Sequence, residues 1–186
     1  MTADSVSRSS VSRAVALTAL CVIFGYGEDA SIGRYTAMIE RNPQSARAYN
    51  KRGVAYEQAE RYDKAIADYS KAIELKPDAP NFYFNRGNAY LSQGDYDHAL
   101  KDYDQAIRFA PDDADYFNNR AMAYWHKGDY DKAAENASAA IWPKPQDADF
   151  YDTRGKAYEK KGDRARAQAD IAKVEELSRD RQPPPR

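Results

Sequence analysis

A tyrosine recurs every 34 residues along most of this 186-residue chain, at Tyr56, Tyr90, Tyr124 and Tyr158. A small residue precedes each of them by three positions, at Gly53, Gly87, Ala121 and Gly155. An alanine follows each by nine positions, at Ala65, Ala99, Ala133 and Ala167. Such a period is typical of repeat proteins, in which no unit buries its apolar face alone and neighbours must stack. The period defines four units, 46–79, 80–113, 114–147 and 148–181.

Each unit is predicted to be a helical hairpin. In the second unit, Tyr83, Gly87 and Tyr90 have helical spacing, a break follows at 93–95, and a second helical run covers 96–109. A proline cannot continue a helix, so the second helix should end before Pro77, Pro111 and Pro145 in the first three units.

The recurring positions resemble the tetratricopeptide repeat (TPR) family. Its pattern of aromatic, small residue, tyrosine, alanine, aromatic, alanine and proline is met in the first unit by Tyr49, Gly53, Tyr56, Ala65, Tyr69, Ala72 and Pro77. The third unit departs from the pattern at Ala121 and Ala137, and the fourth, a degenerate C-terminal repeat, departs at Ile171, Val174 and Arg179. The resemblance implies an all-α fold, a right-handed α-solenoid of stacked antiparallel helical hairpins.

The N-terminal residues have the anatomy of a secretory signal peptide. An apolar run over 14–24 follows Arg8 and Arg13 and precedes a small-x-small pattern that ends at Gly27. The run is too short to span a bilayer. We therefore predict a signal peptide over 1–27 and export to the periplasm or the medium. The alternatives are a decayed repeat helix in a cytoplasmic protein and a lipid anchor on Cys21, which the bulky Leu20 disfavours.

The remaining end segments complete the predicted organisation. Residues 28–45 are expected to hold an N-terminal capping helix, half a repeat, because 30–43 matches the second helix of the pattern. Residues 182–186 form a Pro-rich tail that we expect to be disordered.

Composition argues against several classes of function. The 28 basic and 29 acidic residues nearly cancel, which gives no general attraction to nucleic acid. With one cysteine and two histidines, the sequence is not expected to form a metal site. It also contains no glycine-rich phosphate loop, so no cofactor is expected. His98 and His126 are interpreted as solvated surface residues. No nucleophile stands beside a base, so we expect no enzyme.

An arginine occupies the same position in all four units, at Arg52, Arg86, Arg120 and Arg154. Sixteen residues later stand Asp68, Asp102, Asn136 and Asp170, at similar height in an antiparallel hairpin. We predict structural pairs across each hairpin rather than an anion site, because an arginine and a carboxylate can pair through two parallel hydrogen bonds.

The family resemblance also implies a concave groove lined by the first helix of each repeat. Carried onto this sequence, the groove positions are Arg47, Asn50, Lys51, Phe84, Asn85, Asn88, Leu91, Asn118, Asn119, Met122 and Trp125, continued by His126, Asp149, Asp152 and Lys156. Asn85 and Asn119 would hold the backbone of an extended peptide, and Phe84 and Trp125 would supply apolar pockets. The alternative is that the two asparagines serve packing.

Trp142 departs from the pattern because it takes a position that is usually polar. Pro143 follows it, and we expect Trp142 to fold back over the small residues Ala137 and Ala140. The alternative is that Trp142 is exposed and serves as a contact residue.

The predicted function is a non-catalytic scaffold or adaptor that binds a peptide or a partner protein in the concave groove. The alternative is a structural component of an envelope complex that self-associates through its solenoid ends, as a homo-oligomer. The groove residues indicate the chemistry of a partner without naming it.

Overall fold

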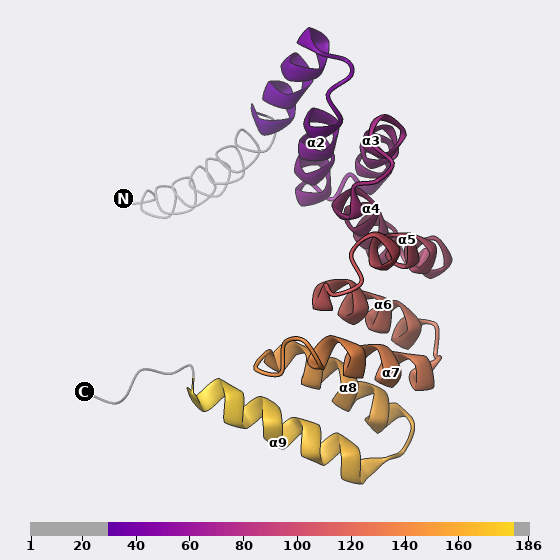
Figure 1. Ribbon diagram of the computed structural model, residues 1–186, viewed down its shortest axis with the longest axis vertical. Coiled ribbons are helices and arrows are strands. Elements are labelled where there is room, and N and C mark those ends of the chain that lie inside the picture. Colours follow the sequence, from indigo (N-terminus) through magenta and orange to yellow (C-terminus); the bar gives the residue numbers. More distant parts are fainter. Residues whose placement is uncertain (1–29, 181–186) are drawn as a thin grey trace, which may run out of the picture.

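The computed structural model describes residues 30–180, which form a curved stack of helices (Figure 1). The predicted signal peptide over 1–27 and the tail over 182–186 lie outside the described residues. Within the described part there is no strand. A helix over 30–41 comes first. It is followed by α2 (Ala46–Gln58), α3 (Tyr62–Leu75), α4 (Pro80–Gln93), α5 (Tyr96–Phe109), α6 (Ala114–His126), α7 (Tyr130–Ile141), α8 (Ala148–Lys160) and α9 (Arg164–Asp180).

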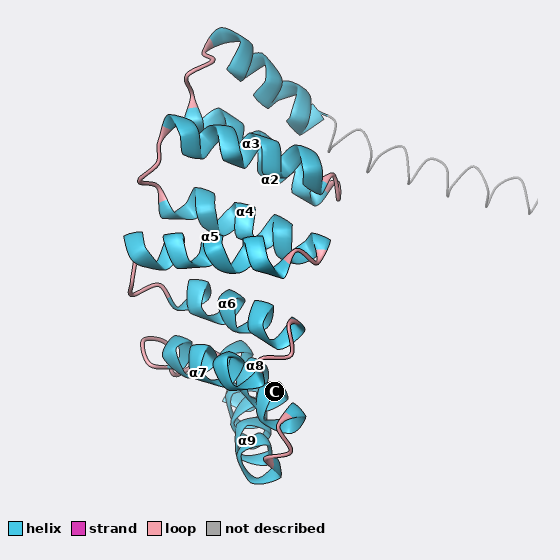
Figure 2. Cartoon of the chain, turned by 90° about the vertical axis from the view of Figure 1, so that its right-hand side faces the viewer, coloured by secondary structure: helices cyan, strands magenta, loops and turns pink. Residues whose placement is uncertain are grey.

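The helices pair into hairpins, and the hairpins stack. In each of four hairpins the first helix contacts the second, as α2 contacts α3 and α8 contacts α9. The second helices α3, α5 and α7 each contact the hairpin that follows. Figure 2 shows the hairpins one after another along the long axis. The first helices also contact one another, α2 with α4, α4 with α6 and α6 with α8, so they form a continuous surface. The predicted all-α solenoid is confirmed.

Three of the four hairpin turns contain a glycine with a positive φ angle, at Gly94 (81°), Gly128 (82°) and Gly162 (76°). In the second hairpin the amide of the next residue, Asp95, donates to the carbonyl of Tyr90 at 2.9 Å, which closes the end of α4. Glu60 stands at the same place in the first turn and has a φ of 55°, a conformation that a side chain disfavours.

Close packing of a tyrosine against a glycine holds the first two hairpins together. Tyr69 and Tyr103 are wholly buried in the second helices. A β-carbon on Gly53 would lie 2.6 Å from Cε1 of Tyr69, nearer than atoms can approach. In the third hairpin the tyrosine is replaced by Ala137, and the facing residue is Ala121, with both fully buried. The two departures from the pattern in the third repeat therefore compensate for each other: without the tyrosine ring, an alanine fits where the other repeats have glycine.

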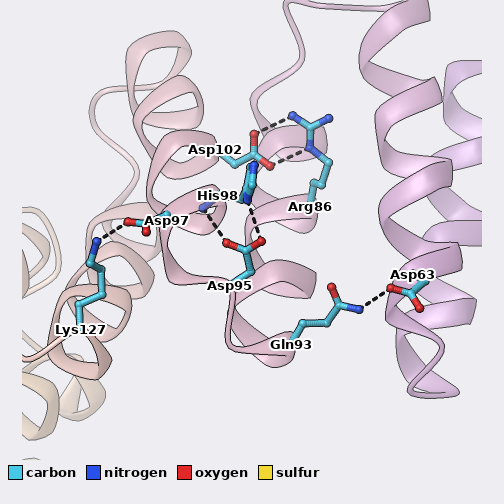
Figure 3. Close-up of polar contacts among 8 residues, drawn as sticks. All are labelled: Asp63, Arg86, Gln93, Asp95, Asp97, His98, Asp102 and Lys127. Atoms are coloured by element: carbon cyan, nitrogen blue, oxygen red, sulfur yellow. Dashed lines mark hydrogen bonds and ion pairs between the residues drawn. The ribbon is translucent and has the colours of Figure 1, made fainter.

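The predicted arginine pairs are confirmed. Arg86 donates from Nε and Nη2 to the two carboxylate oxygens of Asp102 at 2.7 and 2.8 Å (Figure 3), and from Nη1 to Oγ of Ser70 in the preceding hairpin at 2.9 Å. Arg52 and Arg154 repeat this pattern, with Nη1 donating to Thr36 and Ser138. Each arginine thus ties three helices together, and the link to Thr36 joins the helix over 30–41 to the first hairpin.

The third hairpin has its carboxylate in a different place. Arg120 donates from Nε to Oδ1 of Asn136 at 2.7 Å, and its Nη1 donates to Oδ1 of Asp104 at 2.6 Å. Asp104 lies on α5, where Ser70 and Ser138 stand in the other hairpins. The negative charge has moved from the arginine's own hairpin to the preceding one, and the ion pair is kept.

A second set of polar contacts joins neighbouring hairpins at their turns. The side chain of Gln93 donates to Asp63 at 2.7 Å, and Lys127 pairs with Asp97 at the equivalent place one repeat later (Figure 3). These contacts are largely exposed, and such pairs contribute little to stability individually.

The prediction for Trp142 is wrong. Its side chain is 89% exposed, directly after the end of α7. Ala137 and Ala140, over which it was expected to fold, are already fully buried, and Ala140 packs with Ala114 and Phe150. Phe150, from the next hairpin, makes the contact with Ala140 that was expected of the indole.

Candidate functional site

A cavity of about 500 Å³ opens between α6 and α8, on the surface that the first helices form. Its lining residues are Asn118, Met122, Trp125, His126, Asp149, Asp152, Thr153 and Lys156. The cavity therefore joins three of the predicted groove residues, Asn118, Met122 and Trp125, with the four that were expected to continue the groove. Most of its lining surface is apolar, which suits a ligand with apolar side chains. We call this cavity the α6–α8 pocket.

Met122 and Trp125 contribute apolar surface to the pocket lining. Met122 is 37% exposed, and Trp125 packs against the buried Ala133, Ala134 and Ala157. The ring of His126 stacks on Tyr96 with centroids 5.2 Å apart, and an edge contact joins it to Trp125. His126 is exposed, as is His98, which confirms that both histidines are surface residues.

Amide side chains pair between the first helices along the rest of the groove. Asn85 donates from Nδ2 to Oδ1 of Asn50 at 2.9 Å, and Asn119 donates from Nδ2 to Oδ1 of Asn88 at 2.8 Å. The Asn88 oxygen also accepts from the Tyr103 hydroxyl. One N–H of Asn85 and one of Asn119 thus serve packing between repeats. Each of these two amides has a second N–H and an oxygen that could contact a peptide. A role of Asn85 and Asn119 in peptide binding therefore stays a prediction.

This pairing is broken at the pocket. Asn118 occupies the repeat position of Asn50, but the position of Asn85 is taken by Thr153 in α8. The Thr153 hydroxyl donates to the carbonyl of Asp149 in its own helix at 3.0 Å. Asn118 is only 8% exposed, and its Oδ1 is buried with no hydrogen-bond partner. An unpaired buried polar atom costs about 1–3 kcal/mol, so the fold holds an unmet acceptor here.

The indole N–H of Trp125 is a second buried polar group without a partner. Two residues of the pocket lining therefore carry one donor and one acceptor that the protein itself does not satisfy. Unsatisfied buried groups are rare in native proteins and call for a specific explanation.

Charge is unevenly distributed along the first helices. At the pocket, Asp149 and Asp152 face one lysine, Lys156, whose ammonium lies 2.6 Å from the Asp152 carboxylate. Asp149 makes no ion pair among residues 30–180. On α2, at the other end of the groove, Arg47 and Lys51 are exposed. The groove thus changes from cationic on α2 to anionic on α8.

The remaining predicted groove residues lie outside the pocket. The ring of Phe84 packs on Tyr116 with centroids 4.7 Å apart, and Leu91 packs against a buried cluster that contains Leu100 and Tyr103. Both side chains are partly used by the core. Thr153 was not predicted as a site residue. The sequence does contain a signal for it, because the equivalent positions of the second and third units both hold asparagine.

A half-buried carboxylate lies on the groove side of the first hairpin. The Tyr69 hydroxyl donates to Oε2 of Glu57 at 2.6 Å. Burial raises the pKa of Glu57 above its ordinary value, although the hydrogen bond from Tyr69 opposes the shift. Burial and the neighbouring carboxylate also raise the pKa of Tyr69.

Neither a metal centre nor a membrane span is found in the part of the chain that the structure describes. No three histidine, cysteine, aspartate or glutamate side chains are grouped there as they would be around a metal ion. Of the helices between residues 30 and 180, none combines the length and the apolarity needed to cross a bilayer.

Comparison with protein families gives matches over most of the described residues. A model described as "TPR repeat" matches residues 58–94 and 87–128. Two models described as "Tetratricopeptide repeat" match residues 35–67 and 148–181. No curated protein matches the sequence significantly.

Several solved structures resemble the chain. A crystal structure of MamA superposes with a TM-score of 0.77 at 25% identity, covering 82% of this chain and 90% of that one. The MamA segment from residue 41 to its end, from Desulfovibrio magneticus RS-1, gives a TM-score of 0.80 at 19% identity and covers 95% and 98%. YrrB, described as a TPR protein with an unusual peptide-binding site, gives 0.71 at 20% identity and covers 88% and 84%.

The family matches agree with the stacked hairpins and with the 34-residue period. The chain belongs to the tetratricopeptide repeat family.

Proposed function

We propose that this protein is a non-catalytic adaptor that binds an extended segment of a partner protein across the α6–α8 pocket. The fold and the family support a protein-interaction scaffold, because the first helices of stacked hairpins offer one continuous concave surface.

The observation that carries the proposal is the pair of unmet polar groups in the pocket lining. Asn118 Oδ1 is an acceptor and Trp125 Nε1–H is a donor, and both are buried without a partner. An extended backbone presents N–H and C=O groups along its length, so a bound segment could satisfy both groups after small side-chain rotations. Its apolar side chains would then rest on Met122.

Selection from a displayed random-peptide library tests this proposal. Peptides enriched by the wild type should be lost on a Met122→Glu variant, because a carboxylate in the apolar part of the lining would oppose burial of an apolar side chain. Met122 is 37% exposed, so the change should not unfold the protein.

The matched control is Met38→Glu, which places the same charge at a methionine that is 46% exposed on the helix over 30–41, outside the pocket. This variant should enrich the same peptides as the wild type. Equal enrichment by the Met122→Glu variant would place binding elsewhere and overturn the proposal.

Self-association through the solenoid ends is a second candidate, and the last helix favours it. Ile171 is 53% exposed on α9, which no further hairpin covers among the described residues. Sedimentation velocity tests this. A wild-type dimer that Ile171→Asp converts to monomer would favour self-association, and a monomeric wild type would contradict it.

The predicted export also stands as a proposal that rests on the N-terminal sequence alone. N-terminal sequencing of the native protein tests it, since an exported protein should begin after Gly27, whereas an intact start at Met1 or Thr2 would contradict export.

A further inference from the structure

We propose that the α6–α8 pocket receives an arginine side chain of the bound segment, flanked by apolar residues that cover Met122. This inference rests on the proposed function and adds the chemistry of the ligand to it. It depends on three features of the pocket: its charge, its unmet acceptor and the indole of Trp125 in its lining.

The charge of the lining favours a cation. Asp149 and Asp152 stand on α8 opposite α6, and Lys156 compensates only one of them, through its 2.6 Å contact with Asp152. The other titratable groups nearby are His126, which is stacked on Tyr96, and Lys160, whose ammonium lies 5.9 Å from the centre of the Trp125 ring. Asp149 is the carboxylate that a ligand cation can pair with at no cost to an existing ion pair.

The unmet acceptor is the second, independent observation. Asn118 is more than nine-tenths buried, it lines the pocket, and its Oδ1 has no partner. Rotation of the amide about its last side-chain torsion, which is soft, exchanges the places of Oδ1 and Nδ2, so that a ligand donor in the cavity meets the oxygen. A neutral amide oxygen and a carboxylate in the lining of one pocket provide two acceptors for one ligand group.

Arginine suits these acceptors better than lysine does. A guanidinium carries five N–H donors in a rigid planar fork, so it can donate to Asp149 and Asn118 at once while its flat face lies on the Trp125 indole. A lysine ammonium is a compact and strongly hydrated charge, which makes its transfer into a mostly apolar pocket costlier.

Fluorescence titration tests the inference. In a Trp142→Phe variant, Trp125 is the only tryptophan left of the two in the chain. The probes are capped pentapeptides Ala-Leu-Xaa-Leu-Ala, in which Xaa is arginine, its neutral isostere citrulline, lysine or glutamate. The arginine peptide should bind about tenfold more tightly than the citrulline peptide, with lysine between them and glutamate weakest.

Two further variants in the same background locate the acceptors. Asp149→Asn should bring the arginine-to-citrulline ratio close to one. Asn118→Leu should lower the ratio by several-fold while leaving no other group unpaired, because the Asn118 oxygen has no partner to lose. The control is Asp115→Asn, at the equivalent position of α6, which removes the same charge outside the pocket. Asp115 pairs there with Lys144 at 3.0 Å, and its loss should leave the ratio unchanged.

The outcomes separate this inference from the proposed function. If all four peptides bind with equal affinity, the pocket binds peptides but arginine recognition is wrong. If Asp115→Asn lowers the ratio as much as Asp149→Asn does, the preference is a general charge effect and the inference is also wrong. If none of the peptides alters the fluorescence and the library yields none that depends on Met122, both proposals fail.

Discussion

The ring of Tyr103 lies against Gly87, where a β-carbon would stand 2.8 Å from its Cε1 atom. Gly53 and Tyr69 have the same relationship one repeat earlier. The third hairpin does not have this glycine–tyrosine contact, because Ala121 and Ala137 stand at the two positions. Glycine at this position is therefore required by the tyrosine opposite it rather than by the backbone of the helix.

The first prediction concerns this contact. Gly87→Ala should lower the free energy of unfolding by about 1–3 kcal/mol, because the new methyl group overlaps a fully buried ring. Tyr103→Ala alone should cost more, since it leaves a cavity. The double variant should cost less than the sum of the two, because the new methyl group then has room.

Chemical denaturation of the four proteins in this cycle measures the coupling. Gly155→Ala is the control: its β-carbon would meet Cβ of Asp170 at 3.2 Å, a milder contact, so the loss should be smaller. If the losses of unfolding free energy in the two single variants simply add up in the double variant, the residues at these two positions do not compensate for each other.

The second prediction restores the missing amide pair. Thr153→Asn should place an amide where it can donate to Asn118, as Asn85 donates to Asn50, and should raise stability by about 1 kcal/mol. Thr153→Val is the control, because it removes the hydroxyl without adding a donor. An equal effect of the two substitutions on the unfolding midpoint would show that the amide is not what matters.

The third prediction concerns the first hairpin turn. Glu60 holds a φ of 55°, whereas glycine stands at this place in the other three turns. Glu60→Gly should stabilise the protein by about 1 kcal/mol, because it removes the cost of a side chain in the left-handed region.

Thermal unfolding checks this, with Gly94→Ala as the reciprocal control, which should destabilise the second turn. A loss of stability in Glu60→Gly would mean that the glutamate side chain makes compensating contacts there.

The fourth prediction is a pH dependence. The pKa of Glu57 is raised in the folded protein, so near that pKa the folded state binds more protons than the unfolded state. The contribution of Glu57 to stability is therefore fully present below its unfolded pKa and is lost as the pH rises through the folded pKa.

Glu57→Gln removes this titration and keeps an acceptor for Tyr69. The variant should gain stability relative to the wild type as the pH rises from acid to neutral, measured by denaturation at several pH values. A stability difference that does not change with pH would contradict the raised pKa of Glu57.

The fifth prediction follows from the exposure of Trp142. In a Trp125→Phe variant, the remaining tryptophan should emit at long wavelength, as an indole in water does, since 89% of Trp142 is exposed. Its emission should be readily quenched by acrylamide. A blue-shifted maximum would show that the indole is covered in solution.

Much of the fold could be predicted from the sequence because repetition reports packing directly. A residue type that returns at one position, as Arg52 and Arg86 do, identifies the contact that it makes in every unit. The pairs with Asp68 and Asp102 followed from that spacing.

The site was harder to predict because it lies where the repetition fails. The pocket depends on Thr153 standing where asparagine stands in the two preceding repeats, and the exposure of Trp142 depends on Phe150 having taken the available contact. A departure from a repeat shows that something changes there. Which neighbour compensates for the change is fixed by contacts between units, which a single repeat does not contain.

The position of the carboxylate at Asp104 has a consequence for variants in which a whole repeat is removed. Removing the second repeat would set Arg120 beside Ser70 and Asn136, a cation with no anion. Removing the third would give Arg154 both Asp170 and Asp104. The units look alike, yet Asp104 balances the charge of Arg120 only while the second repeat directly precedes the third. Excision of either of these two repeats would therefore leave an uncompensated charge at the new junction.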